Sequence, residues 1–350
     1  MQTLQDLLGI ELPIIQAPMA GVQDSALAIA VSNAGGLGSL PCALFSAEQM
    51  RAELMAIKAG TDRPFNVNFF CHTPPAPNAE RESIWRKTLE PYYRELGLDQ
   101  NSAVATSQRT PFAAEAADIL EDFRPPVVSF HFGLPSPALL ARVRTWDAKI
   151  LSSATTVEEA LWLEAHGVDA IIAQGLEAGG HRGHFLSDDL TRHLTTFTLI
   201  LQIAQAVNVP VIAAGGIAHA RGVAAARPLG AAGAQSGTAY LLCPEATTSS
   251  VHRRALTSDA ARHTALTNLF SGRPARGIMN RLMRDLGPLN SIAPEFPLAT
   301  AALAPLRAKA EREGRDDFSP LWAGQNASTC RAIGAAELTR GLATESTSRS

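Results

Sequence analysis

Residues 170–184 read Ala-Ile-Ile-Ala-Gln-Gly-Leu-Glu-Ala-Gly-Gly-His-Arg-Gly-His and carry a strong structural signal. The apolar run 170–173 predicts a buried strand, and the polar Gln174 predicts its end. A glycine pair, 179–180, then precedes His181. A buried strand that opens into a glycine loop with a histidine is typical of α/β enzymes that present a reactive group to a ligand. The alternative is a tight turn with a solvated histidine.

The same rhythm of apolar strand and helix extends from this stretch in both directions. Two of the expected helices begin with capping boxes, Ser46 with Gln49 and Thr156 with Glu159. Alternation of strands and helices implies parallel pairing with crossover helices. We therefore predict an α/β fold, a TIM (β/α)8 barrel, with an open doubly wound sheet as the alternative. The expected strands are 13–19, 36–40, 65–70, 127–132, 149–153, 170–174, 209–214 and 232–237.

The alternation stops in the last third of the chain, which divides the sequence into a barrel and an addition. Residues 246–317 are rich in Ala, Arg and Pro, and we expect them to form an additional helical lobe over the barrel mouth. The barrel is expected to span residues 1–245 and to be completed by 318–345, with 323–342 as its last outer helix. The small, polar tail 346–350 is expected to be disordered.

Composition excludes several classes of protein. The chain has 350 residues, of which 46% are hydrophobic, so it can bury a large core. A net charge of −3 gives no basic surface for nucleic acid, and no apolar run is long enough to span a membrane. The first twelve residues lack a signal-peptide pattern, and the four cysteines are widely spaced, which fits a cytoplasmic protein. A charged fraction of only 18% permits a homodimer.

Polar residues follow the strands of the predicted barrel, where they would converge on one mouth. The loops with Gly215 and Gly216 and with residues 235–238, the second opening a helix, suit a phosphate group, or they only permit tight turns. The amides of Asn68 and Gln174 suit the mixed donor and acceptor edge of a heterocycle, or they fill the barrel interior.

Three histidines are candidates for chemistry, but a metal site is not expected. His131, His181 and His184 have no carboxylate or cysteine at a spacing that completes a ligand set. His131 stands between two phenylalanines, so a packed, hydrogen-bonded ring is a serious alternative to an active one. His184 is expected to be solvated or at the rim. No Gly-x-Ser-x-Gly elbow supports a serine nucleophile.

Several motifs extend this picture nearly from end to end. They are Pro-Ile-Ile-Gln-Ala-Pro-Met at 13–19, Ser-Asn-Ala-Gly-Gly-Leu-Gly-Ser at 32–39, Pro-Phe-Asn-Val-Asn at 64–68, Ser-Phe-His-Phe-Gly at 129–133, Ala-Gln-Gly-Leu-Glu-Ala-Gly-Gly-His-Arg-Gly at 173–183, Ala-Ala-Gly-Gly-Ile at 213–217 and Trp-Ala-Gly-Gln at 322–325. Together they resemble the class I nitronate monooxygenases, formerly called 2-nitropropane dioxygenases. Residues 76–112 match weakly.

The resemblance implies a flavoprotein oxidoreductase with non-covalent FMN, the nucleotide lying in the barrel. Such an enzyme oxidises alkyl nitronates with O2 through a flavin semiquinone and yields a carbonyl compound plus nitrite or related nitrogen oxides. Propionate 3-nitronate, a toxic metabolite, is the usual proposed substrate, which makes the role nitroalkane detoxification. The same resemblance leaves an NAD(P)H-dependent flavin reductase, acting on a quinone or an enoyl thioester, as an alternative. A flavin-free isomerase or lyase and a non-catalytic flavin-binding protein are two others.

Motif by motif, the resemblance also assigns residues. His181 would be the catalytic residue, and Met19, His131 and His181 would line the substrate pocket. A protonated His181 would stabilise the nitro oxygens, whereas a neutral one could take a proton from a nitroalkane. Ser236 replaces the larger apolar residue usual in the family, which affects flavin packing. The residues implied to hold FMN are Gln16, Ala17, Pro18, Met19, Asn68, Gln174, Gly179, Gly180, Gly215, Gly216, Gln235, Ser236, Gly237 and Thr238.

Overall fold

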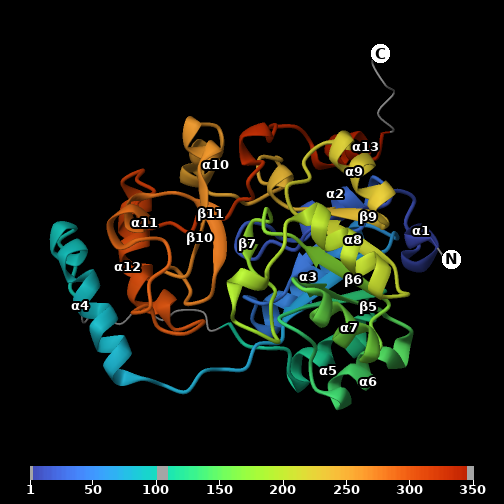
Figure 1. The fold of residues 1–350 in the computed structure, drawn as a ribbon, viewed down its shortest axis with the longest axis horizontal. Coiled ribbons are helices and arrows are strands. Elements are labelled where there is room, and N and C mark those ends of the chain that lie inside the picture. The colour runs from blue at the N-terminus through green and yellow to red at the C-terminus, as the bar shows by residue number, and fades with distance from the viewer. Residues whose placement is uncertain (1–2, 101–108, 345–350) are drawn as a thin grey trace.

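The barrel is an eight-stranded parallel sheet in a computed structural model that describes residues 3–100 and 109–344. Its strands follow one another in the order β1-β9-β8-β6-β5-β4-β3-β2. A parallel bridge between Ile15 and Leu37 closes the sheet from β1 back to the chain before β2. The TIM barrel is therefore confirmed and the open sheet is wrong (Figure 1). The strands are β1 (Ile14–Gln16), β2 (Gly38–Pro41), β3 (Phe65–Phe70), β4 (Val127–His131), β5 (Lys149–Ala154), β6 (Ala170–Gln174), β8 (Val211–Ala214) and β9 (Ala231–Ser236).

Helices surround the barrel strands, and their first residues explain where they begin. Ser46 and Gln49 form the expected capping box. Thr156 accepts the Glu159 N–H as expected, but the Glu159 carboxylate accepts from the N–H groups of Thr155 and Phe185 instead of completing a box. The barrel helices are α1 (Leu4–Leu8), α2 (Ser25–Asn33), α3 (Ala47–Gly60), α5 (Ala114–Phe123), α6 (Pro137–Val143), α7 (Val157–Ala165), α8 (Thr196–Ala206), α9 (Ala220–Ala226) and α13 (Ala335–Ala343). The described residues also form short 3-10 turns, of which η5 falls in the lobe range: η1 (Arg144–Trp146), η2 (Leu190–Arg192), η3 (Arg227–Leu229), η4 (Thr238–Tyr240), η5 (Asp259–Arg262) and η6 (Ala327–Thr329).

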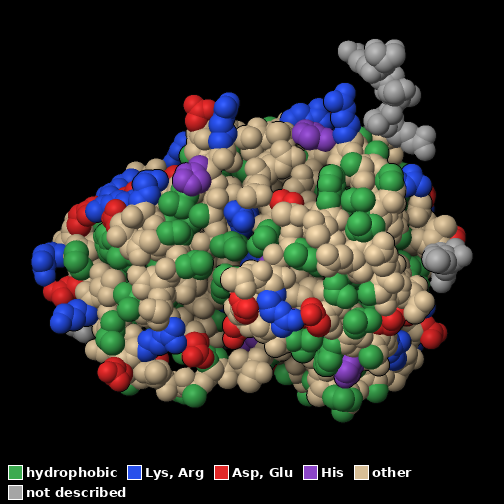
Figure 2. Space-filling view, viewed as in Figure 1, with side chains coloured by type: hydrophobic (Ala, Val, Ile, Leu, Met, Phe, Trp, Pro, Cys, Tyr) green, Lys and Arg blue, Asp and Glu red, His purple; other side chains and the backbone are tan. Residues whose placement is uncertain are grey.

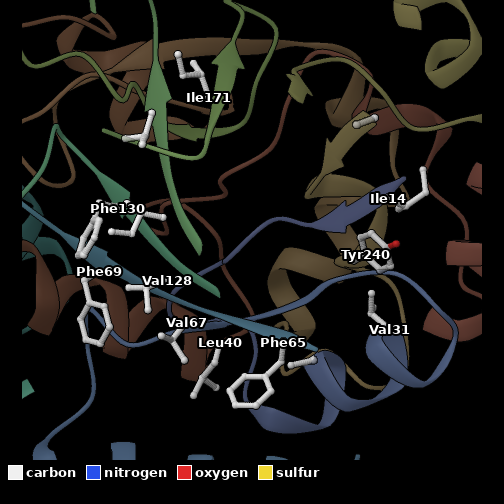
Figure 3. Close-up of a cluster of buried hydrophobic side chains, with 14 of the residues drawn as sticks. Ile14, Val31, Leu40, Phe65, Val67, Phe69, Val128, Phe130, Ile171 and Tyr240 are labelled. Carbon is white, nitrogen blue, oxygen red and sulfur yellow. The ribbon is translucent and has the colours of Figure 1, made fainter. Parts of the chain in front are cut away.

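Alternation along β3 shows how the barrel separates its apolar and polar faces. Phe65, Val67 and Phe69 belong to the large apolar cluster between strands and helices, which Figure 3 shows with Leu40, Val128 and Phe130. The intervening side chains point the other way: the Asn66 amide donates to Ser39 and Ser129 inside the barrel. Successive strand residues face opposite sides, so the apolar packing also fixes which polar groups reach the mouth.

The lobe is less purely helical than expected. It contains α10 (Ser250–Leu256), α11 (Arg281–Leu286) and α12 (Ala299–Arg312), but also β10 (Thr264–Thr267) and β11 (Ala275–Ile278). These two strands pair antiparallel, and β11 also pairs with β7 (Gly180–His181), which comes from the barrel. The strands are too short to show a period of two clearly in the sequence.

The lobe also recruits a helix from the first third of the chain. α4 (Ala79–Glu95) packs on α12, with Trp85 Nε1 donating to Ala299 O at 3.2 Å and Tyr93 Oη to Ala302 O at 2.7 Å. Part of the range 1–245 therefore packs with the lobe rather than around the barrel (Figure 1). Figure 2 shows charged side chains of both signs on the outer surface of the lobe.

The end of the chain differs from expectation. Residues 323–342 do not form one helix: an irregular segment and η6 precede α13, which covers only the last part. The tail expected at 346–350 lies outside the described residues. Among the residues that are described, no helix combines the length and apolar character needed to cross a bilayer.

Candidate active site

A large cavity lies at the carboxyl ends of the barrel strands, beside the lobe. It encloses about 1410 Å³ of space, its open mouth included. Except for Gln16, every residue expected to hold FMN lines it, as do His131 and His181. Further lining residues come from outside the barrel strands: Arg109, His252, Trp322, Gly324 and Asn326.

Gln16 lies behind the cavity wall. Its side chain is fully buried, accepts from Ser39 N at 3.0 Å and donates to Gln23 Oε1 at 2.7 Å. That same Gln23 oxygen accepts from Met19 N at 2.9 Å. Gln16 therefore fixes the loop that carries Met19 through Gln23, an indirect role that the strand-end pattern did not reveal.

His181 is held by both the barrel and the lobe. As part of β7 it pairs with Ala275 of β11. Its Nε2 lies 2.8 Å from the Ser271 hydroxyl of the lobe, and its backbone oxygen accepts from Gln174 Nε2 at 2.9 Å. The ring packs against Phe296 at 5.3 Å between ring centroids. The imidazole is thus oriented before any ligand binds, as a precise proton donor or acceptor requires.

His131 is a packed histidine whose ring nitrogens both serve the protein. Its Nε2 lies 3.2 Å from His181 O, and its Nδ1 lies 3.0 Å from Ser153 Oγ. A carbonyl oxygen only accepts, so Nε2 carries the proton and Nδ1 accepts from the serine hydroxyl. Burial lowers the pKa of His131 to about 4, so the ring is neutral at pH 7. His131 lines the cavity, and its contacts make it a support for the His181 backbone.

The electrostatic surroundings keep His181 neutral. Burial is the main cause that holds the pKa of His181 well below its usual range, and the nearby charge of Arg109 adds to it. Neutral imidazole has one N–H donor and one lone-pair acceptor. The Ser271 hydroxyl lies 2.8 Å from His181 Nε2 and 3.3 Å from Arg273 O. The direction in which this hydroxyl points decides whether Nε2 or Nδ1 of His181 carries the proton.

The two amides expected at a heterocycle differ in their freedom. Gln174 uses both ends of its side chain to shape the His181 loop, since its Oε1 accepts from Gly183 N at 2.8 Å. Asn68 donates to Ser129 Oγ at 2.9 Å, and both of these residues line the cavity. Asn68 is therefore the better placed of the two to contact a ligand without disturbing the loop.

The glycine loops after β8 and β9 form a cradle at the cavity. Gly215 and Gly216 have φ values of +127° and +67°, a backbone shape that strongly favours glycine. The Ser236 hydroxyl donates to Ile217 O at 2.8 Å and so ties the two loops together. The helix expected to open at Thr238 is only the single turn η4.

One buried polar atom in this cradle is unused. Gln235 Oε1 has no hydrogen-bond partner among the described residues, and Gln235 lines the cavity. A buried acceptor without a donor costs about 1–3 kcal/mol. A ligand that carries N–H or O–H donors would remove this cost, and the ring and ribityl chain of FMN carry both kinds. The residues present therefore fit FMN.

The expectation for His184 is wrong. Its side chain is buried, at 1% exposure, and its Nε2 lies 3.4 Å from Asp188 Oδ1. Burial, with the charge of Arg273, lowers its pKa to about 2. Arg273 also donates to the His184 backbone oxygen and covers the loop from the lobe side. No group of metal-binding side chains suited to an ion comes together within the described ranges.

Sequence analysis missed the lobe residues of the site. Ser271 stands 90 positions from His181 and, with Gly-Arg-Pro after it, reads as an ordinary turn. Arg109 lies in the weakly matching range 76–112 and has no pattern around it. The useful signal was Trp322 in the motif Trp-Ala-Gly-Gln, since its ring lies 5.4 Å from that of His181.

Comparison with known proteins identifies the family to which this chain belongs. The family model described as nitronate monooxygenase matches residues 1–345. A nitronate monooxygenase from Paraburkholderia phytofirmans is 44% identical over 348 residues, 98% of this chain and 94% of that protein. One from Pseudomonas aeruginosa is 43% identical over 342 residues, 97% of each. A solved nitroalkane oxidase from Streptomyces ansochromogenes superposes with a TM-score of 0.88 at 38% identity, covering 98% of this chain and 97% of that one. This chain therefore belongs to the nitronate monooxygenase family and is an oxidoreductase.

Proposed function

We propose that this protein is an FMN-dependent monooxygenase that oxidises alkyl nitronates with O2 to a carbonyl compound and nitrite or related nitrogen oxides. Propionate 3-nitronate is the substrate we favour. The observation that carries the proposal is that one cavity joins the glycine cradle to a neutral, pre-oriented His181. The family of the chain and its likeness to a nitroalkane oxidase support it.

Within this proposal, the cradle holds FMN. Gly215, Gly216 and residues 236–238 would bind the phosphate end, Gln235 Oε1 would accept from the ring or the ribityl chain, and Asn68 would contact the ring system. When bound, FMN supplies the redox chemistry with O2 that no side chain in the wall can supply. The protein supplies position and electrostatics.

The protein's own part in the reaction follows from His181. A nitronate is already an anion, so it needs no strong base, and the imidazole N–H can donate to a nitronate oxygen. With a neutral nitroalkane, the nitrogen that lacks a proton can accept the α-proton instead. Because the Ser271 hydroxyl lies at Nε2, Nδ1 is the nitrogen left for the substrate: it donates in one tautomer and accepts in the other, so the same neutral ring can serve both kinds of substrate. Aromatic rings of Phe70, Phe296 and Trp322 around it keep water away from the reacting atoms.

Oxygen uptake by the FMN-loaded protein tests the proposal. We expect propionate 3-nitronate to start O2 consumption and nitrite release at a rate that NADH and NADPH do not change. Rapid anaerobic bleaching of the flavin by either nicotinamide would instead support the reductase. A protein that stays colourless after reconstitution with FMN would favour an isomerase or lyase, and bound FMN without nitronate turnover would indicate a binding protein.

A further inference from the structure

Arg109 brings a positive charge to the cavity wall. The backbone N–H of Phe112 donates to Phe70 O at 2.8 Å, which ties this segment to the end of β3 at the barrel mouth. Arg109 Nη1 donates to Thr300 Oγ1 of α12 at 2.9 Å, and its guanidinium lies 5.6 Å from the centre of the Phe296 ring. Arg109 thus extends from the barrel to the lobe, across the wall on the side of His181.

No carboxylate neutralises this charge within the described residues. None of the ion pairs there, taken to 4.0 Å between nitrogen and oxygen, includes Arg109. Residues 101–108, just before it, contain no Asp or Glu. Burial, with the charge of Arg307, lowers the pKa of Arg109 to about 10, which leaves it charged at neutral pH.

Another buried arginine shows what a purely structural role looks like. Arg182 donates to Gly175 O at 2.6 Å and to Gln174 O at 2.8 Å, and so stabilises the backbone behind the His181 loop. Among the described residues, the Arg109 side chain donates only to Thr300, although a guanidinium has five donors. A largely buried cation in a cavity wall, with no carboxylate partner among the described residues, is suited to bind an anion that arrives with the ligand.

The placement of Arg109 relative to His181 indicates which part of the ligand that anion is. Both groups pack against the Phe296 ring, whose centre lies 5.3 Å from the His181 ring centre and 5.6 Å from the Arg109 guanidinium carbon, so the two are neighbours at the cavity. Since His181 and Arg109 both line the cavity, a ligand with its reacting nitronate at His181 would bring its far end to Arg109. The anion is at the end of a short carbon chain, separate from the reacting group.

We propose that Arg109 is a specificity-determining residue that binds the carboxylate of nitronates carrying an acid group at the far end of the chain, such as propionate 3-nitronate. This inference rests on the proposed function. A guanidinium–carboxylate contact exists before, during and after the reaction, so it contributes mainly to binding. Its loss should raise KM much more than it lowers kcat.

Comparison of two substrates in the FMN-loaded enzyme tests this. Propionate 3-nitronate carries the carboxylate, and propyl-1-nitronate has the same carbon number without it. We expect Arg109→Met to lower the ratio of their kcat/KM values by about tenfold or more, since a charged hydrogen bond contributes about 1.5–3 kcal/mol. Arg109→Lys should restore part of the preference, and Thr300→Val, which loses the anchor but keeps the charge, should give an intermediate value.

Arg51→Met is the matched control, because Arg51 pairs with Asp122 on the surface, far from the cavity wall. It should leave the ratio unchanged. An equal loss on both substrates in Arg109→Met, with the ratio preserved, would overturn the inference and indicate a role in holding the lobe or the nitronate itself.

A binding measurement separates this inference from the proposed function. Succinate, a stable analogue with an anion at each end, should perturb the flavin spectrum of the wild type, and its Kd should rise about tenfold or more in Arg109→Met. Propionate, which has only one anion, should show a much smaller change between the two proteins. Arg109-dependent succinate binding without turnover of any nitronate would contradict the proposed function alone. Nitronate turnover with succinate binding independent of Arg109 would contradict this inference alone.

Discussion

At the scale of single residues, His181 should separate proton removal from cofactor binding. We expect His181→Asn to keep FMN, because the ring contacts Ser271, Phe296 and Trp322 rather than the glycine cradle. Turnover of a neutral nitroalkane should fall by about 100-fold or more, the usual contribution of a general base, with a smaller loss for its preformed nitronate. Steady-state kinetics with nitroethane and ethylnitronate measure both.

His166→Asn is the control, since His166 is exposed just after the end of α7 and stacks on Trp162. Undiminished nitroethane turnover in His181→Asn would show that the role assigned to His181 is wrong.

The residues that sequence patterns revealed are those whose position follows from a strand end. Gln174 ends β6, Asn68 lies two residues before the end of β3, and both line the cavity. His184 lies three positions after His181, but Arg273 of the lobe covers it, a contact between residues 89 positions apart. Such long-range contacts leave no local periodicity, so neither the burial of His184 nor the bond between Ser271 and His181 could be read from the sequence.

At the scale of elements, the glycine loop after β6 is packed tightly against the segment before η6. A Cβ on Gly179 would lie 2.6 Å from Gly324 N, a backbone atom that cannot turn aside as a flexible side chain could. A Cβ on Gly180 meets nothing within 4 Å, although its φ of +72° strains any other residue. The two glycines therefore serve different purposes, clearance and backbone shape.

Gly179→Ala should consequently weaken FMN binding more than Gly180→Ala does. We expect a loss of about tenfold or more in affinity for Gly179→Ala, because the segment with Gly324 must move away from the cavity. Gly180→Ala should cost about 1 kcal/mol of stability from strain alone. Titration of apoprotein with FMN by flavin fluorescence compares the two, and equal affinities would contradict this account.

Element boundaries were predictable where capping and alternation agree, as at Ser46 and along β3. The two-residue β7 was not, because pairing with β11 rather than its own composition makes it a strand. The helix expected at 323–342 does not form over its first part for a related reason: Trp322, Gly324 and Asn326 line the cavity, and their contacts outweigh helix propensity.

At the scale of the whole molecule, buried neutral histidines should make the fold sensitive to acid. Burial lowers the pKa values of His72, His193 and His252 to about 4, below the 6.5 of an exposed histidine. Because the unfolded chain binds these protons first, stability is complete above pH 6.5 and is lost as the pH falls towards 4. At pH 5 each histidine contributes a loss on the order of 2 kcal/mol.

Urea unfolding between pH 7.5 and pH 5 measures this loss. We expect the urea midpoint to fall steadily as the pH is lowered over that range. His193 lies away from the cavity, and His193→Gln should reduce the number of protons taken up on unfolding by about one, which makes the fall of the midpoint with pH less steep. A midpoint that does not change with pH would refute the linkage to these histidines.

The barrel was the most predictable part of the fold, because eight apolar strands that alternate with helices allow few other topologies. The lobe was harder, since its core joins Trp85 and Leu89 of α4 to Leu303, Leu306 and Phe318, more than two hundred positions away. Local sequence carries the strand and helix rhythm, but not which distant helices share a core.

The strand-end loops of the barrel line the cavity, whereas lobe side chains such as Ser271, Phe296 and Thr300 lie behind its wall and position His181 and Arg109. This division has an evolutionary consequence. Mutations that accumulate around residues 270–300 can change which substrates are accepted, while the glycine cradle of the barrel is inherited unchanged. Descendants of one ancestral gene can therefore diverge in substrate range while they keep the same reaction.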